Sequence, residues 1–542
     1  MKNKILISAA IFCAVMVFAR PGFSQEQRAF DQNVRSSEAT ATPLDFYFME
    51  HDSYATGLVN FMESATAFGD YDNDGCLDIL IAGQGYENGG WQHLSKIYHN
   101  NGNGTFTDIN APLIGVKFSA VAWGDYDNDG DLDVVLCGEA QDDTKVCKVY
   151  ENQGEGVFAE NPDAVLPGVF NGAVAWGDYD NDGKLDILLS GDTGGFTGFS
   201  EIYRNNGDGT FTPIDAGLIG FSDASAAFGD YNNDGKLDVL LSGISGDAGV
   251  CSKVYRNNGN GTFTSVGGSM PGAAYGSAAW GDYDNDGDLD FLVTGTSVYI
   301  MRNYGNDTFF PTGSTYFPSP LAYSHAAWGD CNNDGKLDIV LTGDIGQGMP
   351  ERISRVYLNM YPAGFVMLTQ LIGASNGSAA WGDYNNDEKL DILQTGSLEI
   401  GETDNTVLYE NIFADPNTPP ETPADLKAVT GIKKVTLRWG KSSDAQTPQS
   451  GLTYNLYVGT TQESVNVLSP MADISSGWRK VAALGSQNEN TSWVIKDLPV
   501  GKYFWGVQAL DTAFAGSAFA TGSFTVRPDI GPPGPGPLPL PK

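Results

Sequence analysis

The stretch Asp282-Tyr283-Asp284-Asn285-Asp286-Gly287-Asp288-Leu289-Asp290 decides the fold of this chain. It places acidic side chains at positions 1, 3, 5 and 9 of a nine-residue loop, with glycine at position 6. Side chains at positions 1, 3 and 5 converge on one side of a tight turn, and the carbonyl of position 7 adds an oxygen. The carboxylate at position 9 can bind through both oxygens. A hard cation such as Ca²⁺ takes about six to eight oxygen ligands, which this spacing can supply.

The loop differs from an EF-hand, because no glutamate stands at position 12 and residues 291–294 indicate a buried strand. Gly287 lets the backbone turn at positive φ. The loop occurs seven times, at intervals of 48 to 55 residues, with its first Asp at Asp70, Asp125, Asp178, Asp230, Asp282, Asp330 and Asp383. One copy fits an ordinary acidic turn as well as a metal site. Seven copies in register favour calcium, and the period indicates a propeller or a solenoid.

The predicted ligands of up to seven Ca²⁺ ions stand at positions 1, 3, 5, 7 and 9 of each loop, with position 7 acting through its carbonyl. In the first three loops they are Asp70, Asp72, Asp74, Cys76, Asp78; Asp125, Asp127, Asp129, Asp131, Asp133; and Asp178, Asp180, Asp182, Lys184, Asp186. In the fourth and fifth they are Asp230, Asn232, Asp234, Lys236, Asp238; and Asp282, Asp284, Asp286, Asp288, Asp290. In the last two they are Asp330, Asn332, Asp334, Lys336, Asp338; and Asp383, Asn385, Asp387, Lys389, Asp391.

Composition narrows the class of protein. The chain has 542 residues, enough for two or three domains, and its 68 glycines with only 30 Lys and Arg are typical of a turn-rich all-β protein. A net charge of −37 argues against nucleic acid or anionic membranes as partners, and the acidic loops explain much of that charge.

The N-terminus has the pattern of an export signal. Lys2 and Lys4 precede an apolar run, and small residues at Gly22 and Ser24 suit a cleavage site, so we expect residues 1–24 to be a signal peptide. The run is too short to span a membrane, and no other stretch is long and apolar enough. We therefore expect an exported protein, secreted or at the cell surface, without a membrane span and monomeric.

Five cysteines follow that segment, without metal-type spacing: Cys76, Cys137, Cys147, Cys251 and Cys331. Cys137 and Cys147 flank a predicted hairpin turn and could form a bridge. We favour the alternative that all five are scattered small hydrophobic residues.

Each repeat has one order of elements. A strand ending in aromatic-Gly runs into the acidic loop, an apolar strand follows, then a variable loop, a third strand, a Gly-Asn turn and a short fourth strand. Near-continuous apolar strands suit burial on both faces between stacked sheets. Four short strands per repeat, seven times over, predict a seven-bladed β-propeller over residues 44–414.

The Asp-x-Asp/Asn-x-Asp-Gly-x-x-Asp loop with its preceding aromatic-Gly resembles the FG-GAP/VCBS repeats of integrin-α-like β-propellers. The resemblance implies calcium in each loop on one face, with ligands usually bound on the opposite face. Two features depart from the pattern. Position 3 is Asn in the fourth, sixth and seventh loops, and Glu388 replaces the glycine at position 6 of the seventh loop, which puts that site in doubt.

The seventh repeat lacks a fourth strand, and we expect residues 45–48 to supply it and close the ring. Residues 25–43 are predicted to be a flexible lead-in, 415–423 a Pro-rich linker and 528–542 a Pro/Gly-rich tail. Alternating strands over 424–527 indicate a β-sandwich. The segment from Leu498 to Tyr503 resembles the tyrosine corner of fibronectin type III domains.

Two classes of function remain open. The favoured one is a non-catalytic binding or adhesion protein for extracellular carbohydrate or protein. The alternative is a carbohydrate-active enzyme, of polysaccharide lyase or glycosidase type, that uses the face opposite the calcium loops. The four histidines belong to no nucleophile or zinc motif. Acidic, Arg or Tyr side chains clustered at the pore mouth would favour the enzyme, and a flat aromatic rim would favour binding.

Aromatic residues suggest where a ligand binds. Those before Gly-Asp recur in every repeat and are therefore assigned to packing between blades: Phe68, Trp123, Trp176, Phe228, Trp280, Trp328 and Trp381. The loops between the second and third strands, and between repeats, are variable and are expected to lie opposite calcium. From these loops we predict that a ligand contacts Trp91, Phe196, Phe199 and Tyr316.

Overall fold

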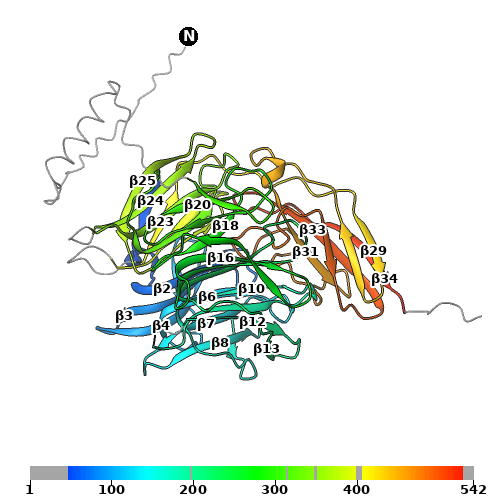
Figure 1. The fold of residues 1–542 in the computed structure, drawn as a ribbon, viewed down its shortest axis with the longest axis horizontal. Helices are drawn as coiled ribbons and strands as arrows, with labels where there is room; N and C mark the ends of the chain where they lie inside the picture. Colours follow the sequence, from blue (N-terminus) through cyan, green and yellow to red (C-terminus); the bar gives the residue numbers. More distant parts are fainter. Residues whose placement is uncertain are drawn as a thin grey trace, which may run out of the picture. The chain divides into compact units, whose positions relative to one another are not determined.

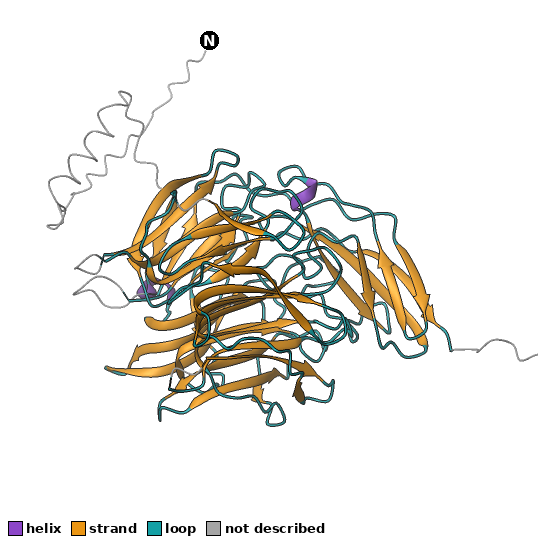
Figure 2. Ribbon diagram, in the orientation of Figure 1, coloured by secondary structure: helices purple, strands orange, loops and turns teal. Residues whose placement is uncertain are grey.

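The computed structural model describes residues 47–154, 156–195, 198–312, 315–346, 351–397 and 406–528. The expected signal peptide, the lead-in and nearly all of the tail lie outside these residues. Strands form almost all of the regular structure in them (Figure 2), beside the four-residue helix α2 (Ser53–Thr56) and the 3-10 turn η1 (Gln449–Gly451). No helix in this part of the chain is long and apolar enough to cross a membrane.

Antiparallel sheets follow one another along residues 48–411 (Figure 1), as expected of an all-β, propeller-like repeat. The first comprises β2 (Phe61–Gly69), β3 (Asp78–Glu87), β4 (Gly90–Asn100), β5 (Phe106–Asp108), β6 (Val116–Gly124), β7 (Asp133–Ala140), β8 (Lys145–Asn152) and β9 (Phe158–Glu160). Its two groups of four strands are joined by a single pair, Leu94 opposite Val116.

The next four sheets each have four strands in sequence order. They are β10 (Phe170–Gly177), β11 (Asp186–Asp192), β12 (Gly198–Asn205), β13 (Phe211–Pro213); β14 (Ser222–Gly229), β15 (Asp238–Ser245), β16 (Gly249–Asn257), β17 (Phe263–Met270); β18 (Ala278–Gly281), β19 (Asp290–Val293), β20 (Tyr299–Asn303), β21 (Phe309–Thr312); and β22 (Ala322–Gly329), β23 (Asp338–Asp344), β24 (Arg352–Asn359), β25 (Phe365–Ala374).

The last repeat uses a strand from the other end of the chain. Its own strands are β26 (Ala379–Gly382), β27 (Asp391–Gln394) and β28 (Val407–Asn411), and β1 (Phe48–His51) completes the sheet by pairing antiparallel with β28. The expected exchange is confirmed, although the strand spans 48–51 rather than 45–48, and residues 45 and 46 lie outside the described part of the chain. The Phe48 ring lies 6.3 Å from that of Trp381.

The strands after the acidic loops begin with buried residues, as their apolar sequences predict, and β3, β7, β15 and β23 become partly exposed only toward their far ends. All seven residues of β11 and all four of β19 are buried. They begin with the position-9 Asp of the loop, so the loop is anchored directly to the core. This rigid attachment fixes one end of every candidate cation site.

The recurring aromatics pack between repeats, which confirms their assignment. Each ring lies against the glycine that ends the first strand of the preceding repeat, so closely that a Cβ there would come within 3 Å of the ring. The pairs are Gly69 with Trp123, Gly124 with Trp176, Gly177 with Phe228, Gly229 with Trp280, Gly281 with Trp328, Gly329 with Trp381 and Gly382 with Phe68. The last pair joins the final repeat to the first.

Asparagines at the ends of the third strands make a second series of joints. Each Nδ2 donates a hydrogen bond of 2.6–2.9 Å to the position-2 carbonyl of the acidic loop in the preceding repeat. The pairs are Asn100 with Tyr384, Asn152 with Tyr71, Asn205 with Tyr126, Asn257 with Tyr179, Asn303 with Tyr231, Asn359 with Tyr283 and Asn411 with Cys331. These bonds tie every acidic loop to the repeat that follows it.

The expectation that all cysteines are unpaired is wrong for two of them. Cys137 on β7 and Cys147 on β8 stand directly opposite each other and form a disulfide. Direct opposition across a hairpin brings the two sulfurs together, which the spacing alone did not settle. Cys251 and Cys331 are buried free thiols, and Cys76 is free and partly exposed.

The C-terminal region contains two three-stranded sheets. One is β29 (Lys427–Gly431), β30 (Lys434–Arg438) and β32 (Ser492–Ile495), and the other is β31 (Thr453–Gly459), β33 (Gly501–Leu510) and β34 (Ala520–Val526). Their shared core includes Trp439, Trp493 and Trp505. The connecting segments pack on the repeats, since Met471, Val481 and Phe514 belong to core clusters made mostly of residues from the repeats.

Candidate functional site

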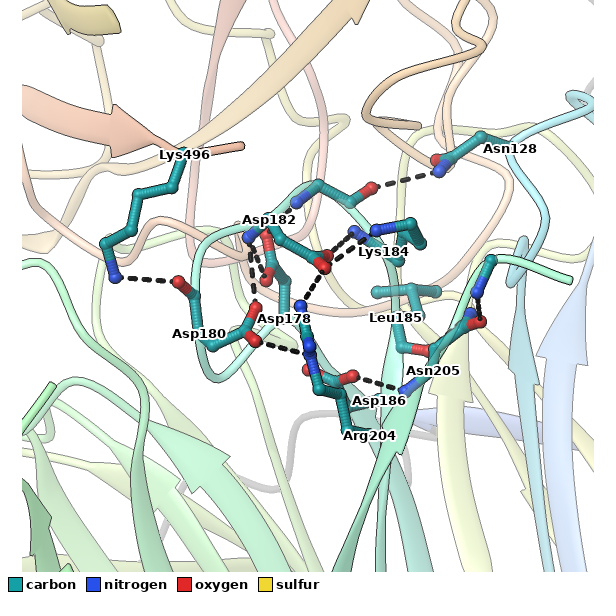
Figure 3. Close-up of polar contacts among 12 residues, drawn as sticks. Asn128, Asp178, Asp180, Asp182, Lys184, Leu185, Asp186, Arg204, Asn205 and Lys496 are labelled. Atoms are coloured by element: carbon teal, nitrogen blue, oxygen red, sulfur yellow. Dashed lines mark hydrogen bonds and ion pairs between the residues drawn. The ribbon is translucent and has the colours of Figure 1, made fainter. Parts of the chain in front are cut away.

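The third acidic loop shows how each loop is built (Figure 3). Asp178 accepts hydrogen bonds from the backbone N–H groups of Asp182 and Gly183, both at 2.9 Å. The N–H of Asp182 also donates to Asp180, at 3.2 Å. Positions 1, 3 and 5 are therefore held on the inside of the turn by its own backbone, as the spacing predicts.

The position-9 carboxylate ties the loop to the sheet. Asp186 accepts from the backbone N–H groups of Asn205 at 2.8 Å and Tyr179 at 3.1 Å. Burial, with nearby Asp182 and Asp180, raises the pKa of Asp178 to about 8, and burial with Asp178 raises the pKa of Asp186 well above its usual range. Buried carboxylates this close together favour the binding of a positive charge.

The same geometry recurs in the loops that carry Asp at position 3. Carboxylate oxygens within 4.8 Å of one another form the groups Asp70, Asp72, Asp74; Asp125, Asp127, Asp133; Asp178, Asp180, Asp186; and Asp282, Asp284, Asp290. Burial raises the pKa of Asp78 to about 8 and that of Asp125 to about 7. In the fifth loop, Oδ2 of the fully buried Asp290 has no hydrogen-bond partner in the described part of the chain. These oxygen-only groups fit Ca²⁺.

Loops with Asn at position 3 keep the fold with less charge. Asn232, Asn332 and Asn385 each accept a hydrogen bond from the N–H of position 5, at 3.0–3.1 Å. Burial still raises the pKa of Asp238 to about 9, and it raises those of Asp338 and Asp391 well above their usual range.

Glu388 adopts the turn that glycine adopts in the other six loops. Its φ is +66°, and its N–H donates to Asp383 at 2.8 Å, as Gly75 donates to Asp70. The seventh loop therefore has the shape of the others, with a side chain in the left-handed region.

Position-7 side chains mostly contact neighbouring carboxylates. Lys184, Lys336 and Lys389 pair with the Asp at position 5 at 2.7–2.9 Å, and Lys236 makes the same pair with Asp234. Asp131 accepts from Asn73 at 2.6 Å, and Asp288 accepts from Asn233 at 3.1 Å. The N–H of Cys76 donates to Asp74 at 2.8 Å.

Sequence reasoning missed the asparagine at position 4, although it is present in every loop. All seven have φ between 55° and 63°, a region that Asn tolerates. In six of the loops its Nδ2 donates to the position-6 carbonyl of the next loop, at 3.5 Å for Asn333 and at 2.8–2.9 Å for Asn128, Asn181, Asn233, Asn285 and Asn386. The last of these bonds reaches Gly75, in the first loop. Neighbouring candidate sites are thus linked directly.

The sequence also gave no indication that the C-terminal region contacts the acidic loops. Side chains of Trp478, Asn490 and Thr512 donate to Oδ2 of the first Asp in the first, fourth and sixth loops, at 3.1, 2.9 and 2.8 Å. Lys496 binds the third loop through its N–H and its ammonium, both at 2.7 Å (Figure 3). In the fifth loop Ser450 donates to the carbonyl of Asn285 at 2.6 Å, and the carboxylate of Glu489 lies beside Gly287. Burial and the neighbouring Asp282 raise the pKa of Glu489 to about 10.

A cavity of about 420 Å³ lies between the first strands of the repeats and is bordered by Met471, Val481 and Phe514 of the C-terminal region. At the other end of the same strands lies a recess of about 520 Å³. The recess includes one non-glycine residue at φ between 44° and 55° from each repeat: Glu63, Phe118, Asn171, Asp223, Tyr275, Tyr323 and Asn376. Most of these stand at a β-bulge in the first strand.

The predicted ligand contacts are not gathered at one place. Trp91 is 41% exposed and packs against Tyr86, near the β3–β4 turn at the recess end of its sheet. Phe199 is half-buried and packs on a core cluster, and Phe196 lies outside the described residues. Tyr316 lies against Gly364, in the β24–β25 turn at the acidic-loop end. The expected position of Tyr316 opposite calcium is therefore wrong, because the neighbouring Phe317 packs on the β24–β25 hairpin, against Tyr357 and Phe365.

A family model described as FG-GAP-like repeat matches residues 66–136, 137–189, 190–241, 243–293 and 291–341, together just over half of the chain. No curated protein sequence shows a significant match.

Several solved structures are similar in outline. A copper-bound fungal alcohol oxidase of the AA5 family has 13% identity and a TM-score of 0.45, over 86% of this chain and 98% of its own. A lectin of Aleuria aurantia, described as a six-bladed β-propeller, has 11% identity and a TM-score of 0.34, over 58% and 97%. A human fibronectin type III domain has 22% identity and a TM-score of 0.16, over 22% and 98%. TM-scores below 0.5 carry no argument about function.

Proposed function

Since the chain belongs to the family of FG-GAP-like repeat proteins, we propose that it is an exported, calcium-binding, seven-bladed β-propeller. It acts as a monomeric, non-catalytic binding or adhesion protein for extracellular carbohydrate or protein. Two complete series of joints support seven blades. The aromatic–glycine contacts and the asparagine bonds each number seven, and each series returns from the last repeat to the first.

We assign residues 424–527 to a fibronectin type III-like domain. Two three-stranded sheets around one core support this assignment, as does the hydroxyl of Tyr503, which donates to the carbonyl of Pro499 at 2.8 Å. A tyrosine that bonds back to the backbone a few residues upstream is typical of such sandwiches.

Calcium binding rests on the buried carboxylates. Each acidic loop concentrates three to five carboxylates, and the one at position 9 is buried in every loop. The positive side chains beside the loops pair mainly with positions 3 and 5. A cation at positions 1 and 9 would therefore offset the repulsion that burial magnifies.

The single observation that carries the binding role is the ring of strained residues around the recess. Non-glycine residues in the left-handed region cost roughly 1–3 kcal/mol each and persist where the surrounding structure imposes them, often at functional sites. The other end of the propeller is contacted by the C-terminal region, so the recess is the end that a ligand can reach.

The chemistry of the recess suits a carbohydrate. The rings of Tyr275 and Tyr323 lie 5.1 Å apart and are about 45% exposed, so they offer faces for a sugar ring. Asp223 lies close enough to raise the pKa of Tyr275, and it can accept hydrogen bonds from sugar hydroxyls. Trp91, with Tyr86, remains a proposed outer contact.

A glycan-array screen of the mature protein in calcium tests the binding role. For any glycan that binds, the double variant Tyr275→Ala, Tyr323→Ala should lose binding while its melting temperature stays unchanged. Phe310→Ala is the matched control, because Phe310 is 58% exposed and does not line the recess. Equal binding by both variants would remove the recess from the proposal.

A second candidate, the carbohydrate-active enzyme, is favoured by the acidic residues of the same recess, Glu63 and Asp223. Acidic residues together with tyrosines are expected at a site that cleaves polysaccharides, whereas a flat aromatic rim is expected at a site that only binds them. Incubating bound glycans with the protein and analysing the products decides between the candidates. Cleavage of the glycan by the wild type that is lost in Asp223→Asn would establish the enzymatic function. Recovery of intact glycan would support the binding function.

A further inference from the structure

Contacts from the C-terminal domain to the acidic loops differ in kind from loop to loop. Lys480 and Lys496 donate to backbone carbonyls of the second and third loops. In the first, fourth and sixth loops a neutral donor bonds to Oδ2 of the first Asp: Trp478, Asn490 and Thr512. A donor there satisfies a carboxylate oxygen without adding charge. Such contacts need no metal ion to be favourable.

At the fifth loop Ser450 donates to the carbonyl of Asn285 at 2.6 Å, and the group that faces the carboxylates is Glu489, the residue before Asn490. Its Oε2 lies over Gly287, 3.1 Å from where a Cβ on that glycine would stand. The loop already holds five carboxylates, at Asp282, Asp284, Asp286, Asp288 and Asp290. The described ion pairs of this loop all come from Arg302, which binds Asp284 at 2.7 Å and Asp286 at 3.0 Å, leaving Asp282 and Glu489 without a cation.

A second observation indicates where a cation would sit. Asp290 is fully buried, and its Oδ2 has no hydrogen-bond partner among the residues that the structure describes. One carboxylate oxygen each of Asp282, Asp284 and Asp290 lies within 4.8 Å of the other two, and the side chain of Asp284 is buried as well. In the other loops of this kind, Oδ2 of the position-9 Asp accepts a backbone hydrogen bond instead, as Asp78, Asp133 and Asp186 do.

We propose that Glu489 is a calcium ligand supplied by the C-terminal domain to the fifth acidic loop, so that one ion binds the propeller and the sandwich together. The loop has no glutamate of its own at position 12, and Glu489 provides a carboxylate from another domain in its place. The ion holds this interface closed, because without it two facing carboxylates repel each other. This inference rests on the proposed calcium binding.

Glu489→Gln tests the inference in the full chain, because it keeps the shape and removes the charge. Melting temperatures are measured in excess chelator and in millimolar calcium for the wild type, for Glu489→Gln and for Glu421→Gln, a control at an exposed position in the linker. We expect Glu489→Gln to melt higher than the wild type in chelator and to gain less from calcium. Its fifth site should bind calcium at least about 10–100-fold more weakly, because loss of a ligand's partner alone typically costs that much and Glu489 is proposed as a ligand itself.

Equal calcium-induced gains in the three proteins would overturn the role of Glu489 but leave calcium binding intact. If the wild type gained nothing from calcium, both the inference and the proposed function would fail. A crystal structure of the full chain grown in calcium is a second test that needs no variant. An ion about 2.3–2.6 Å from a Glu489 oxygen supports the inference, and an ion bound by the loop alone overturns it.

Discussion

Replacing Glu388 by glycine should stabilise the seventh acidic loop. Glu388 has φ of +66°, in the region where a Cβ crowds the following carbonyl oxygen, whereas the other six loops have glycine there. Its N–H donates to Asp383 at 2.8 Å, as the glycines donate in their loops, and its carbonyl accepts from Asn333 at 3.5 Å and from the N–H of Asn417 at 2.8 Å. The substitution therefore removes strain without removing a backbone hydrogen bond.

The gain is the difference between two terms. A left-handed residue with a Cβ costs about 1–2 kcal/mol, and glycine loses about 0.5–1 kcal/mol more backbone entropy on folding. The net gain is about 0.5–1 kcal/mol. If the loop becomes ordered on binding calcium, the same difference appears as roughly two- to fivefold tighter binding at this site.

Calorimetry and calcium titration of Glu388→Gly, Glu388→Ala and the wild type measure this gain. The alanine variant removes the carboxylate but keeps the Cβ, so it separates strain from charge. We expect the Glu388→Gly variant to be more stable than the Glu388→Ala variant, and the Glu388→Ala variant to have the stability of the wild type. Gly75→Ala should lose about 1 kcal/mol, because the space around Gly75 is open and only the backbone is strained. A glycine variant no better than alanine would refute the reasoning.

Three further predictions concern the ring and its ligand face. A chain that begins at Asp52 lacks β1, so β28 keeps an unpaired edge. We expect this shortened chain to have a markedly lower melting temperature or to aggregate. A melting temperature equal to that of the intact chain would contradict closure by β1. Gly382→Ala would bring a Cβ within 2.6 Å of Phe68 at the joint between the last and first repeats, and it should cost about 1–3 kcal/mol in thermal unfolding. The same substitution at Gly90, whose Cβ would meet nothing within 4 Å, should cost less than half of that; equal losses would contradict the packing argument. Trp91→Ala should weaken binding of a glycan found by screening and leave the calcium-dependent melt intact, because the ring is 41% exposed; unchanged affinity would remove Trp91 from the ligand contacts.

Features that repeat within a local window could be predicted from the sequence. The turn geometry of the acidic loops, the burial of the strands that follow and the packing of the recurring aromatics all depend on residues a few positions apart, or on one contact copied in each repeat. The N-terminal strand could be predicted because the last repeat lacked one. Its position was shifted by three residues, since register depends on pairing across the ring.

Features that depend on single contacts between distant segments could not be predicted. Nothing in the local pattern pairs Glu489 with Asp282 or brings Thr512 to Asp330. The left-handed residues that line the recess, such as Tyr275 and Asp223, share no residue type, because the backbone, not the side chain, sets the conformation there. Tyr316 was misplaced for a related reason, since the path of a connecting segment follows its tertiary contacts.

The most direct test of the account is the thermal melt of the mature protein in excess chelator and in millimolar calcium. A single site occupied at about 100 times its dissociation constant adds about 2.7 kcal/mol, and several such sites acting together would be a large share of a typical folding free energy. We therefore predict a large rise in melting temperature on adding calcium, reversed by chelator. An unchanged melting temperature would contradict the claim that calcium holds these acidic loops together.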